Sequence, residues 1–223
     1  MIARPDPITI DGPAGAGKST IARIVAEKLG LTYIDTGAMY RAVTYKALKN
    51  KIDMTDPKKM CGIAAGSRIR FDKQKILLDG EDVSRKIRSR TVTNRTSITA
   101  ASGEVRRILR DMQRQFAEKS GVVMEGRDIG TVVFPRARFK FYLDASISER
   151  AKRRFLELKE KGNPQILERI IADINKRDNI DKTRGLCPLK IPAGATVIDS
   201  TNKSIEEVAD IIIKEVAEKS GKK

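Results

Sequence analysis

The 223-residue chain contains no histidine, no tryptophan and only two cysteines, and aromatic residues make up 4% of it. The absence of histidine excludes Ser-His-Asp hydrolysis, Cys-His proteolysis and histidine-ligated metal sites. The low aromatic content argues against a protein that binds single-stranded nucleic acid by stacking bases on aromatic side chains. Cys61 and Cys187 lie far apart without metal-ligand spacing, and we expect both to be reduced thiols rather than a disulfide.

Long hydrophobic runs are missing as well. No stretch approaches the roughly 18 apolar residues of a membrane span. The first residues, Met1 to Asp6, lack an apolar signal segment. We therefore expect a cytoplasmic protein without a membrane partner, and its length suggests between one and two domains.

Acidic residues are in the minority, because 45 lysines and arginines stand against 29 aspartates and glutamates and give a net charge of +16. Such a balance predicts an anionic partner. Nucleic acid is the habitual interpretation, but nucleotides are polyanions too, and a protein that binds two of them needs a cluster of cations. Charge alone does not decide between these partners.

A glycine-rich stretch fits the phosphate-binding pattern G-x-x-x-x-G-K-[ST] at every position. Its glycines let backbone N–H groups turn toward a phosphate chain, and the helix that follows directs its positive end at the same anion. Lys18 would reach the outer phosphates of a nucleoside triphosphate, and the Ser19 hydroxyl would be a ligand of Mg²⁺. A simple turn is the alternative, but a strand pattern precedes the loop and a helical pattern follows it. The loop consists of Gly12, Pro13, Ala14, Gly15, Ala16, Gly17, Lys18, Ser19 and Thr20.

Short apolar runs typical of buried parallel strands alternate with helical patterns along the chain. This alternation predicts an α/β protein with a doubly wound P-loop fold, in which helices cover both faces of a five-stranded parallel sheet. Ligands of such a sheet bind at the carboxyl ends of the strands. The expected strands are 7–10, 31–35, 122–125, 139–143 and 196–199, and the expected helices include 19–30, 38–49, 103–119 and 204–219.

Residues 36–121 are far more than the about 10–12 that a crossover between strands needs, so we expect an inserted second lobe. Within it, residues 68–71 and 75–78 predict a β-hairpin with its turn at 72–74, and residues 79–83 lead into further strand. The amphipathic helix 103–119 should return the chain to the core.

Residues 146–179 show two helical patterns that break at Lys161-Gly162-Asn163-Pro164. The first pattern carries Arg150, Arg153 and Arg154. A solvated charged face is the ordinary meaning of such a run. Beside a phosphate-binding core, however, an arginine-rich helical hairpin is typical of an active-site lid that brings charge to the γ-phosphate and excludes water.

Four motifs stand out in the chain: residues 12–20, 35–41 and 125–135, and Arg177-Asp178 with Asp181 and Arg184. Together they resemble those of the bacterial cytidylate kinase family, and the similarity extends over nearly the whole chain. The phosphate loop is shared by many enzymes, whereas residues 125–135 are far more specific. The resemblance implies transfer of the γ-phosphoryl group of ATP, with Mg²⁺, to CMP or dCMP. Glu125 departs from the aspartate of many relatives, and Cys187-Pro188 follows Arg184 as a second departure.

The resemblance also implies a division into a P-loop core (1–36, 106–147 and 180–223), a nucleotide-monophosphate lobe with a small antiparallel sheet (37–105) and a lid of two helices (148–179). It implies roles for individual side chains, which could otherwise be ion pairs or surface positions. Lys18, Arg150, Arg153 and Arg154 would be catalytic; Arg41 and Arg127 would hold the acceptor phosphate; Ser97, Arg106, Asp128 and Arg184 would surround the cytosine; Arg177 and Asp181 would contact the ribose; and Thr36, Gly37 and Tyr40 would lie beside the acceptor.

Two alternatives remain at this stage. The chain could be a P-loop ATP- or GTP-binding protein whose basic surface binds nucleic acid, or a kinase for a different monophosphate or a small metabolite. We favour the CMP and dCMP kinase interpretation, with no stable nucleic acid partner and a monomeric protein.

Overall fold

The computed structural model describes residues 6–72, 75–160, 162 and 164–221. The chain divides into two compact units: unit 1 comprises the residues up to Tyr33 and those from Gly121 onward, and unit 2 comprises Ile34–Ser120. Helix α5 (Gly103–Lys119) lies in unit 2, where it packs on the other helices of that unit, and the expected lobe boundary between residues 105 and 106 stays a prediction.

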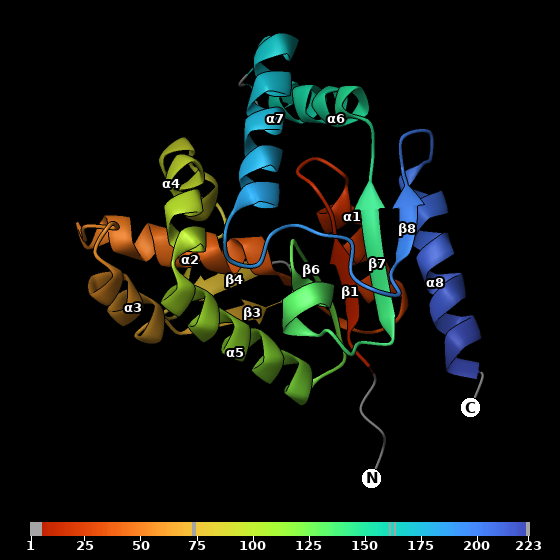
Figure 1. The fold of residues 1–223 in the computed structure, drawn as a ribbon, viewed down its shortest axis with the longest axis horizontal. Coiled ribbons are helices and arrows are strands. Elements are labelled where there is room, and N and C mark those ends of the chain that lie inside the picture. The colour runs from red at the N-terminus through yellow and green to blue at the C-terminus, as the bar shows by residue number, and fades with distance from the viewer. Residues whose placement is uncertain (1–5, 73–74, 161, 163, 222–223) are drawn as a thin grey trace. The chain divides into compact units, whose positions relative to one another are not determined.

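Unit 1 is built on the predicted five-stranded sheet, whose strand order is β2-β6-β1-β7-β8. Figure 1 shows β6, β1, β7 and β8 side by side. The central strand β1 (Ile8–Asp11) is buried along its length, which explains its apolar sequence. It runs parallel to β6 (Val122–Gly126) and to β7 (Phe139–Asp144). Strand β8 (Thr196–Asp199) continues the sheet beside β7, again parallel, and β2 (Thr32–Asp35) forms the other edge.

The core of unit 1 lies between this sheet and two helices, α1 (Lys18–Lys28) and α8 (Ile205–Gly221). The apolar faces of both helices contribute to one buried cluster with the strand residues. The predicted helical pair also forms, as α6 (Ile147–Glu160) and α7 (Leu167–Thr183), which pack on each other through a small apolar cluster of their own (Figure 1). Lys161 and Asn163 of the expected break lie outside the described residues.

Unit 2 contains four α-helices, a short 3-10 helix (Lys86–Arg88) and a small three-stranded antiparallel sheet within its described residues. The predicted hairpin forms, although Lys73 and Gln74 of its turn lie outside the described residues. Two of the helices have no counterpart in the sequence analysis, although Asp56 and Ser89 cap their first turns with side-chain oxygens. The elements are α2 (Thr36–Lys49), α3 (Pro57–Ala65), β3 (Ile69–Asp72), β4 (Lys75–Leu78), β5 (Glu81–Asp82), α4 (Arg90–Ala101) and α5.

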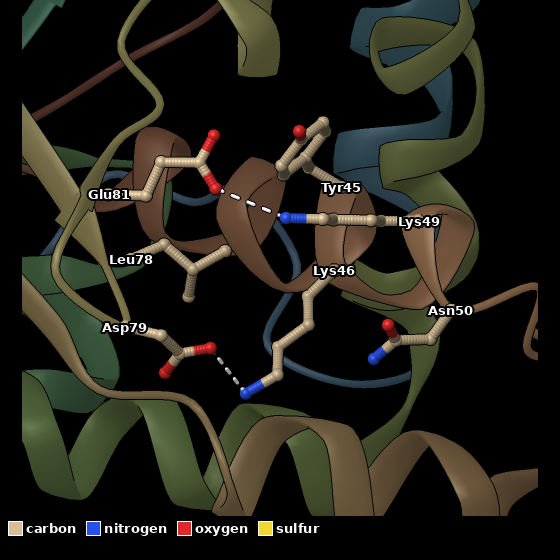
Figure 2. A pocket seen from close by; sticks show the side chains of 7 residues that line it. All are labelled: Tyr45, Lys46, Lys49, Asn50, Leu78, Asp79 and Glu81. Atoms are coloured by element: carbon tan, nitrogen blue, oxygen red, sulfur yellow. Dashed lines mark hydrogen bonds and ion pairs between the residues drawn. The ribbon is translucent and has the colours of Figure 1, made fainter.

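Unit 2 also has a hollow of about 230 Å³ between α2 and the strands β4 and β5, shown in Figure 2. Its charged groups pair with one another: Lys46 Nζ lies 2.7 Å from Asp79 Oδ2, and Lys49 Nζ lies 3.1 Å from Glu81 Oε2. These ion pairs connect the helix to the small sheet, so we assign the hollow to the fold and not to a ligand. Among the described residues, no helix is long and apolar enough to cross a membrane.

Candidate active site

The phosphate loop connects the end of β1 to the start of α1, at the carboxyl edge of the sheet. Gly12 has a φ of +151°, and a Cβ at this position would lie 2.0 Å from the carbonyl oxygen of Leu143. Gly17 has a φ of +87° and lies at the N-cap of α1. Both positions therefore require glycine, the first for its close backbone approach and the second for its left-handed conformation.

The loop presents backbone N–H groups that bond to no acceptor in the part of the chain that the structure describes. Within the described residues, the N–H groups of Gly15, Gly17 and Ser19 make no hydrogen bond to the protein. Neighbouring N–H donors at the start of a helix form an anion site, where the helix dipole adds to the positive potential. The loop can therefore hold a phosphate chain.

Lys18 is buried at the mouth of this loop, with its side-chain Nζ donating to the carbonyl oxygen of Pro13 at 2.7 Å. Burial, followed by the nearby cation of Arg127, lowers the pKa of Lys18 to about 7, although Glu125 opposes this shift. An approaching phosphate would raise the pKa of Lys18 again, because its negative charge favours the ammonium form.

Ser19 and Glu125 face each other across the end of the sheet, where the Ser19 hydroxyl donates to Glu125 Oε1 at 2.5 Å. The Tyr33 hydroxyl donates to the same carboxylate oxygen at 3.3 Å. A hydroxyl and a carboxylate are the hard oxygen ligands that Mg²⁺ prefers, and Mg²⁺ needs few of them when phosphates and water complete its coordination. The described residues contain no cluster of three or more acidic or cysteine ligands for a metal ion. The pair fits Mg²⁺ held jointly with a nucleotide.

Glu125 was noted in the sequence only as a departure from related proteins, and its position beside Ser19 was missed. An acidic residue at the carboxyl end of β6, the strand that pairs with β1 just before the loop, was a usable signal.

Asp11 is a second residue that the sequence analysis missed. Its carboxylate accepts hydrogen bonds from the backbone N–H groups of Ile129 at 2.8 Å and Gly130 at 2.7 Å. These residues begin a π-helical turn, Ile129–Val133, directly after Arg127 and Asp128. Burial raises the pKa of Asp11 to about 6, although the two N–H donors favour its charged form. Asp11 thus connects the start of the phosphate loop to the most specific motif of the sequence.

Four of the expected substrate residues form a chain of alternating charge in unit 1. Arg127 Nε lies 2.8 Å from Asp181 Oδ2, and Arg184 lies 3.7 Å from both Asp181 and Asp128. Burial opposes the ionisation of Asp181, but the facing guanidiniums, Arg127 first, outweigh it and hold the pKa of Asp181 below its usual range. The structure therefore brings these four residues together, while Arg177 lies exposed on α7 nearby.

The three arginines expected in the lid differ in their surroundings. Arg150 is not an exposed arm: it is 4% exposed and forms an ion pair with Asp178 at 2.6 Å. Arg153 is half-buried and donates to the Ser200 carbonyl oxygen at 2.6 Å. Arg154 is exposed and pairs with a glutamate on its own helix. Of the three, only Arg154 is exposed, and their catalytic role in a lid stays a prediction.

The expected substrate residues of unit 2 lie on α2, α4 and α5. Arg41 donates to the Thr93 hydroxyl at 2.7 Å. Arg106 is buried, donates to the Ala100 carbonyl oxygen at 3.0 Å, and has its guanidinium 5.4 Å from the centroid of the Tyr40 ring. Ser97 is exposed on α4, Gly37 is exposed on α2, and Thr36 is buried beside it.

A parallel sheet, a complete phosphate loop at its carboxyl edge and a buried lysine define a P-loop protein of the nucleotide-binding class. A solved structure of an uncharacterized protein from Eubacterium ventriosum, 11% identical, has a TM-score of 0.53 over 96% of this chain and 99% of that one, which shows the fold alone.

Sequence comparison narrows this class. The family model for cytidylate kinase matches residues 8–218. A cytidylate kinase from Caldanaerobacter subterraneus is 51% identical over 91% of both chains. One from Bacillus subtilis is 48% identical over 96% of this chain and 97% of its own. The chain belongs to the cytidylate kinase family and is a phosphotransferase.

Proposed function

We propose that the protein phosphorylates CMP and dCMP, with ATP as the phosphoryl donor and Mg²⁺ as the metal ion. Membership of the family is the observation that carries this proposal. The phosphate loop with its available N–H donors supports it, because ATP offers the phosphate chain that such a loop binds. We also propose a monomer that acts in the cytoplasm on these small molecules, without a stable nucleic acid partner.

In this proposal the loop N–H groups and Lys18 hold the outer phosphates of ATP and neutralise the charge that spreads over the transferred group. Ser19, with Glu125 beside it, would hold Mg²⁺, which when bound supplies further positive charge to the phosphates. Arg153 and Arg154 would contribute positive charge from a lid formed by α6 and α7. Arg150 would contribute from the first turn of α6, next to the loop. The acceptor phosphate is already an anionic nucleophile, so no general base is needed.

The acceptor side of unit 1 can be assigned by polarity. Arg127 presents a planar guanidinium suited to a phosphate, and Asp181 an oxygen acceptor suited to ribose hydroxyls, with Arg177 beside it. Asp128 is 8% exposed, and as a carboxylate it only accepts hydrogen bonds. It would accept from the 4-amino group of cytosine and repel the 4-oxo group of uracil, while Arg184 keeps its orientation.

The residues of unit 2 keep the roles that the resemblance implies, as proposals. Arg41 would hold the acceptor phosphate, Ser97 and Arg106 would surround the base, and Tyr40 would lie beside the acceptor. Thr36 and Gly37, at the start of α2, would also lie there.

The test is a panel of nucleoside monophosphates with ATP and Mg²⁺, with diphosphate products measured for wild type and variants. We expect CMP and dCMP to be phosphorylated well and UMP poorly. Lys18→Ala should reduce turnover by orders of magnitude, because a cation of the transition state is lost. Lys28→Ala, on the exposed end of the same helix, is the matched control and should retain activity.

The same panel of monophosphates tests whether Asp128 selects cytosine over uracil. Asp128→Ala should lose most of the preference for CMP over UMP in kcat/KM and keep ATP binding. An unchanged ratio in a folded variant would assign base selection to other residues. Near-normal turnover of Lys18→Ala would refute the function itself.

A further inference from the structure

One residue of the phosphate loop, Ala14, has both of its backbone polar groups bonded to side chains of the helical pair α6 and α7. Its N–H group donates to Asp178 Oδ1 at 3.2 Å. Its carbonyl oxygen accepts from Arg150 Nη1 at 2.9 Å. These contacts join positions more than 130 residues apart in the sequence, so they hold the loop to two helices that enter the fold much later.

The two side chains are themselves a buried ion pair, with Arg150 Nη1 2.6 Å from Asp178 Oδ2 and both side chains less than a tenth exposed. Arg150 also donates through Nε to the Ala145 carbonyl oxygen at 2.9 Å, at the end of β7. Each ion is therefore compensated by its partner and by backbone groups, as a buried pair requires. A pair of this kind fixes the geometry of what it touches, because neither charge can leave without exposing the other.

The next loop residue is packed against the same arginine. A Cβ on Gly15, which has a φ of +78°, would lie 3.2 Å from the Arg150 Cβ and 3.3 Å from its carbonyl oxygen. The first turn of α6 thus lies directly on the loop, and Asp178 bonds it from α7. Since Gly15 carries one of the available N–H donors, the position of the pair sets the direction of a group that would meet phosphate.

We propose that Asp178 is a positioning residue for the nucleoside triphosphate: with Arg150 it holds the backbone of Ala14 and so keeps the loop in the shape that receives phosphate. The proposal rests on the proposed function, in which this loop binds ATP. It assigns Asp178 no contact with either substrate. The carboxylate acts on ATP affinity through the loop and should leave CMP affinity unchanged.

The experiment compares three variants of the full chain. Asp178→Ala removes both the hydrogen bond to Ala14 and the partner of Arg150. Asp178→Asn retains a side-chain oxygen acceptor but loses the charge. Asp173→Asn makes the same chemical change at an exposed position on the same helix and is the matched control. The dissociation constants of ATP-Mg²⁺ and of CMP are measured separately by titration calorimetry, well below the unfolding temperature of each variant.

We expect Asp178→Ala to weaken ATP binding about tenfold or more, the size of a lost charged hydrogen bond. Asp178→Asn should weaken ATP binding less, and Asp173→Asn should have no effect. CMP binding should stay within twofold in all three, which a general loss of structure would not allow. If Asp178→Ala does not fold, the dissociation constants of ATP-Mg²⁺ and CMP measured on Asp178→Asn test the proposal instead.

Two results would overturn the proposal: ATP affinity within twofold of wild type in a folded Asp178 variant, or equal losses for ATP and CMP. Failure of the wild-type protein to bind ATP at all would instead remove the proposed function. The two failures are therefore distinguishable.

Discussion

The lowered pKa of Lys18 predicts that ATP binding takes up a proton. In the free protein, burial and the neighbouring cation of Arg127 lower the pKa of Lys18 to about 7. A bound polyphosphate places opposite charge beside the amine and raises this pKa toward its ordinary value of 10.5. Lys18 then becomes fully protonated in the complex at any pH near neutrality.

The magnitude follows from the two pKa values. A group with a pKa of about 7 is only about one-tenth protonated at pH 8, so ATP binding should take up about 0.9 proton there. At pH 6 the same group is already about nine-tenths protonated, and the uptake should fall to about 0.1 proton. Because Lys18 must gain a proton for ATP to bind, ATP affinity should also decline as pH rises above 7.

The assay is titration calorimetry of ATP-Mg²⁺ in buffers with different ionisation enthalpies, at pH 8 and at pH 6. At pH 8 the phosphates, whose second pKa is about 6, add little to the proton count. Asp11, with a pKa raised to about 6, also binds almost no proton in the free protein at that pH. Lys18→Arg is the control, since arginine stays charged throughout and should take up no proton. Uptake below about 0.2 proton at pH 8 in the wild type would refute the reasoning.

Three further predictions concern packing, the helical pair and the ribose. Gly130→Ala should destabilise the protein by about 1–3 kcal/mol in urea unfolding, because its Cβ would lie 2.9 Å from the Pro192 ring. Gly62→Ala, with open space on a helix, should stabilise the protein by about 0.5–1 kcal/mol. Urea midpoints equal to that of the wild type would contradict both predictions. Arg154→Ala should lower kcat more than it changes the KM for CMP in steady-state kinetics, and an unchanged kcat would mean that Arg154 is a solvated surface residue. Asp181→Ala should weaken CMP more than dCMP by about 0.5–1.5 kcal/mol in binding titrations, and equal losses would show that Asp181 acts only by pairing with its arginine.

The sheet and the phosphate loop could be predicted from the sequence because their signals are local. The strand before Gly12 is a continuous apolar run, and the loop residues follow a fixed spacing that backbone geometry demands. The expected lobe boundary stays a prediction, because the placement of α5 has no local signal. The amphipathic pattern of α5 shows that one face is buried but not which elements cover it, and they belong to unit 2.

The candidate site was predicted as a set of residues but not as a set of contacts. Arg150 reads as a surface cation in an arginine-rich helix, and only the fold brings Asp178 to it from α7. Glu125 and Asp11 likewise look like strand ends until their partners across the sheet are known. Pairings between distant segments carry no periodicity, so a single sequence does not give the partners, and for Glu125 it gives only a place at the carboxyl end of a strand.

The charge pairing in unit 1 bears on the choice between a nucleotide enzyme and a nucleic acid binder. Arg127, Arg150 and Arg184 each lie within 4 Å of a carboxylate and are largely buried. A surface that binds nucleic acid by releasing counterions needs exposed cations, and its affinity falls about 10³-fold or more between 50 and 200 mM salt. Buried, paired guanidiniums are not available to a polyanion at the surface, and salt screens them much less. The charge pairing therefore favours a small anion that enters the site over a nucleic acid that binds at the surface, because each of these buried arginines is compensated by a carboxylate in the free protein.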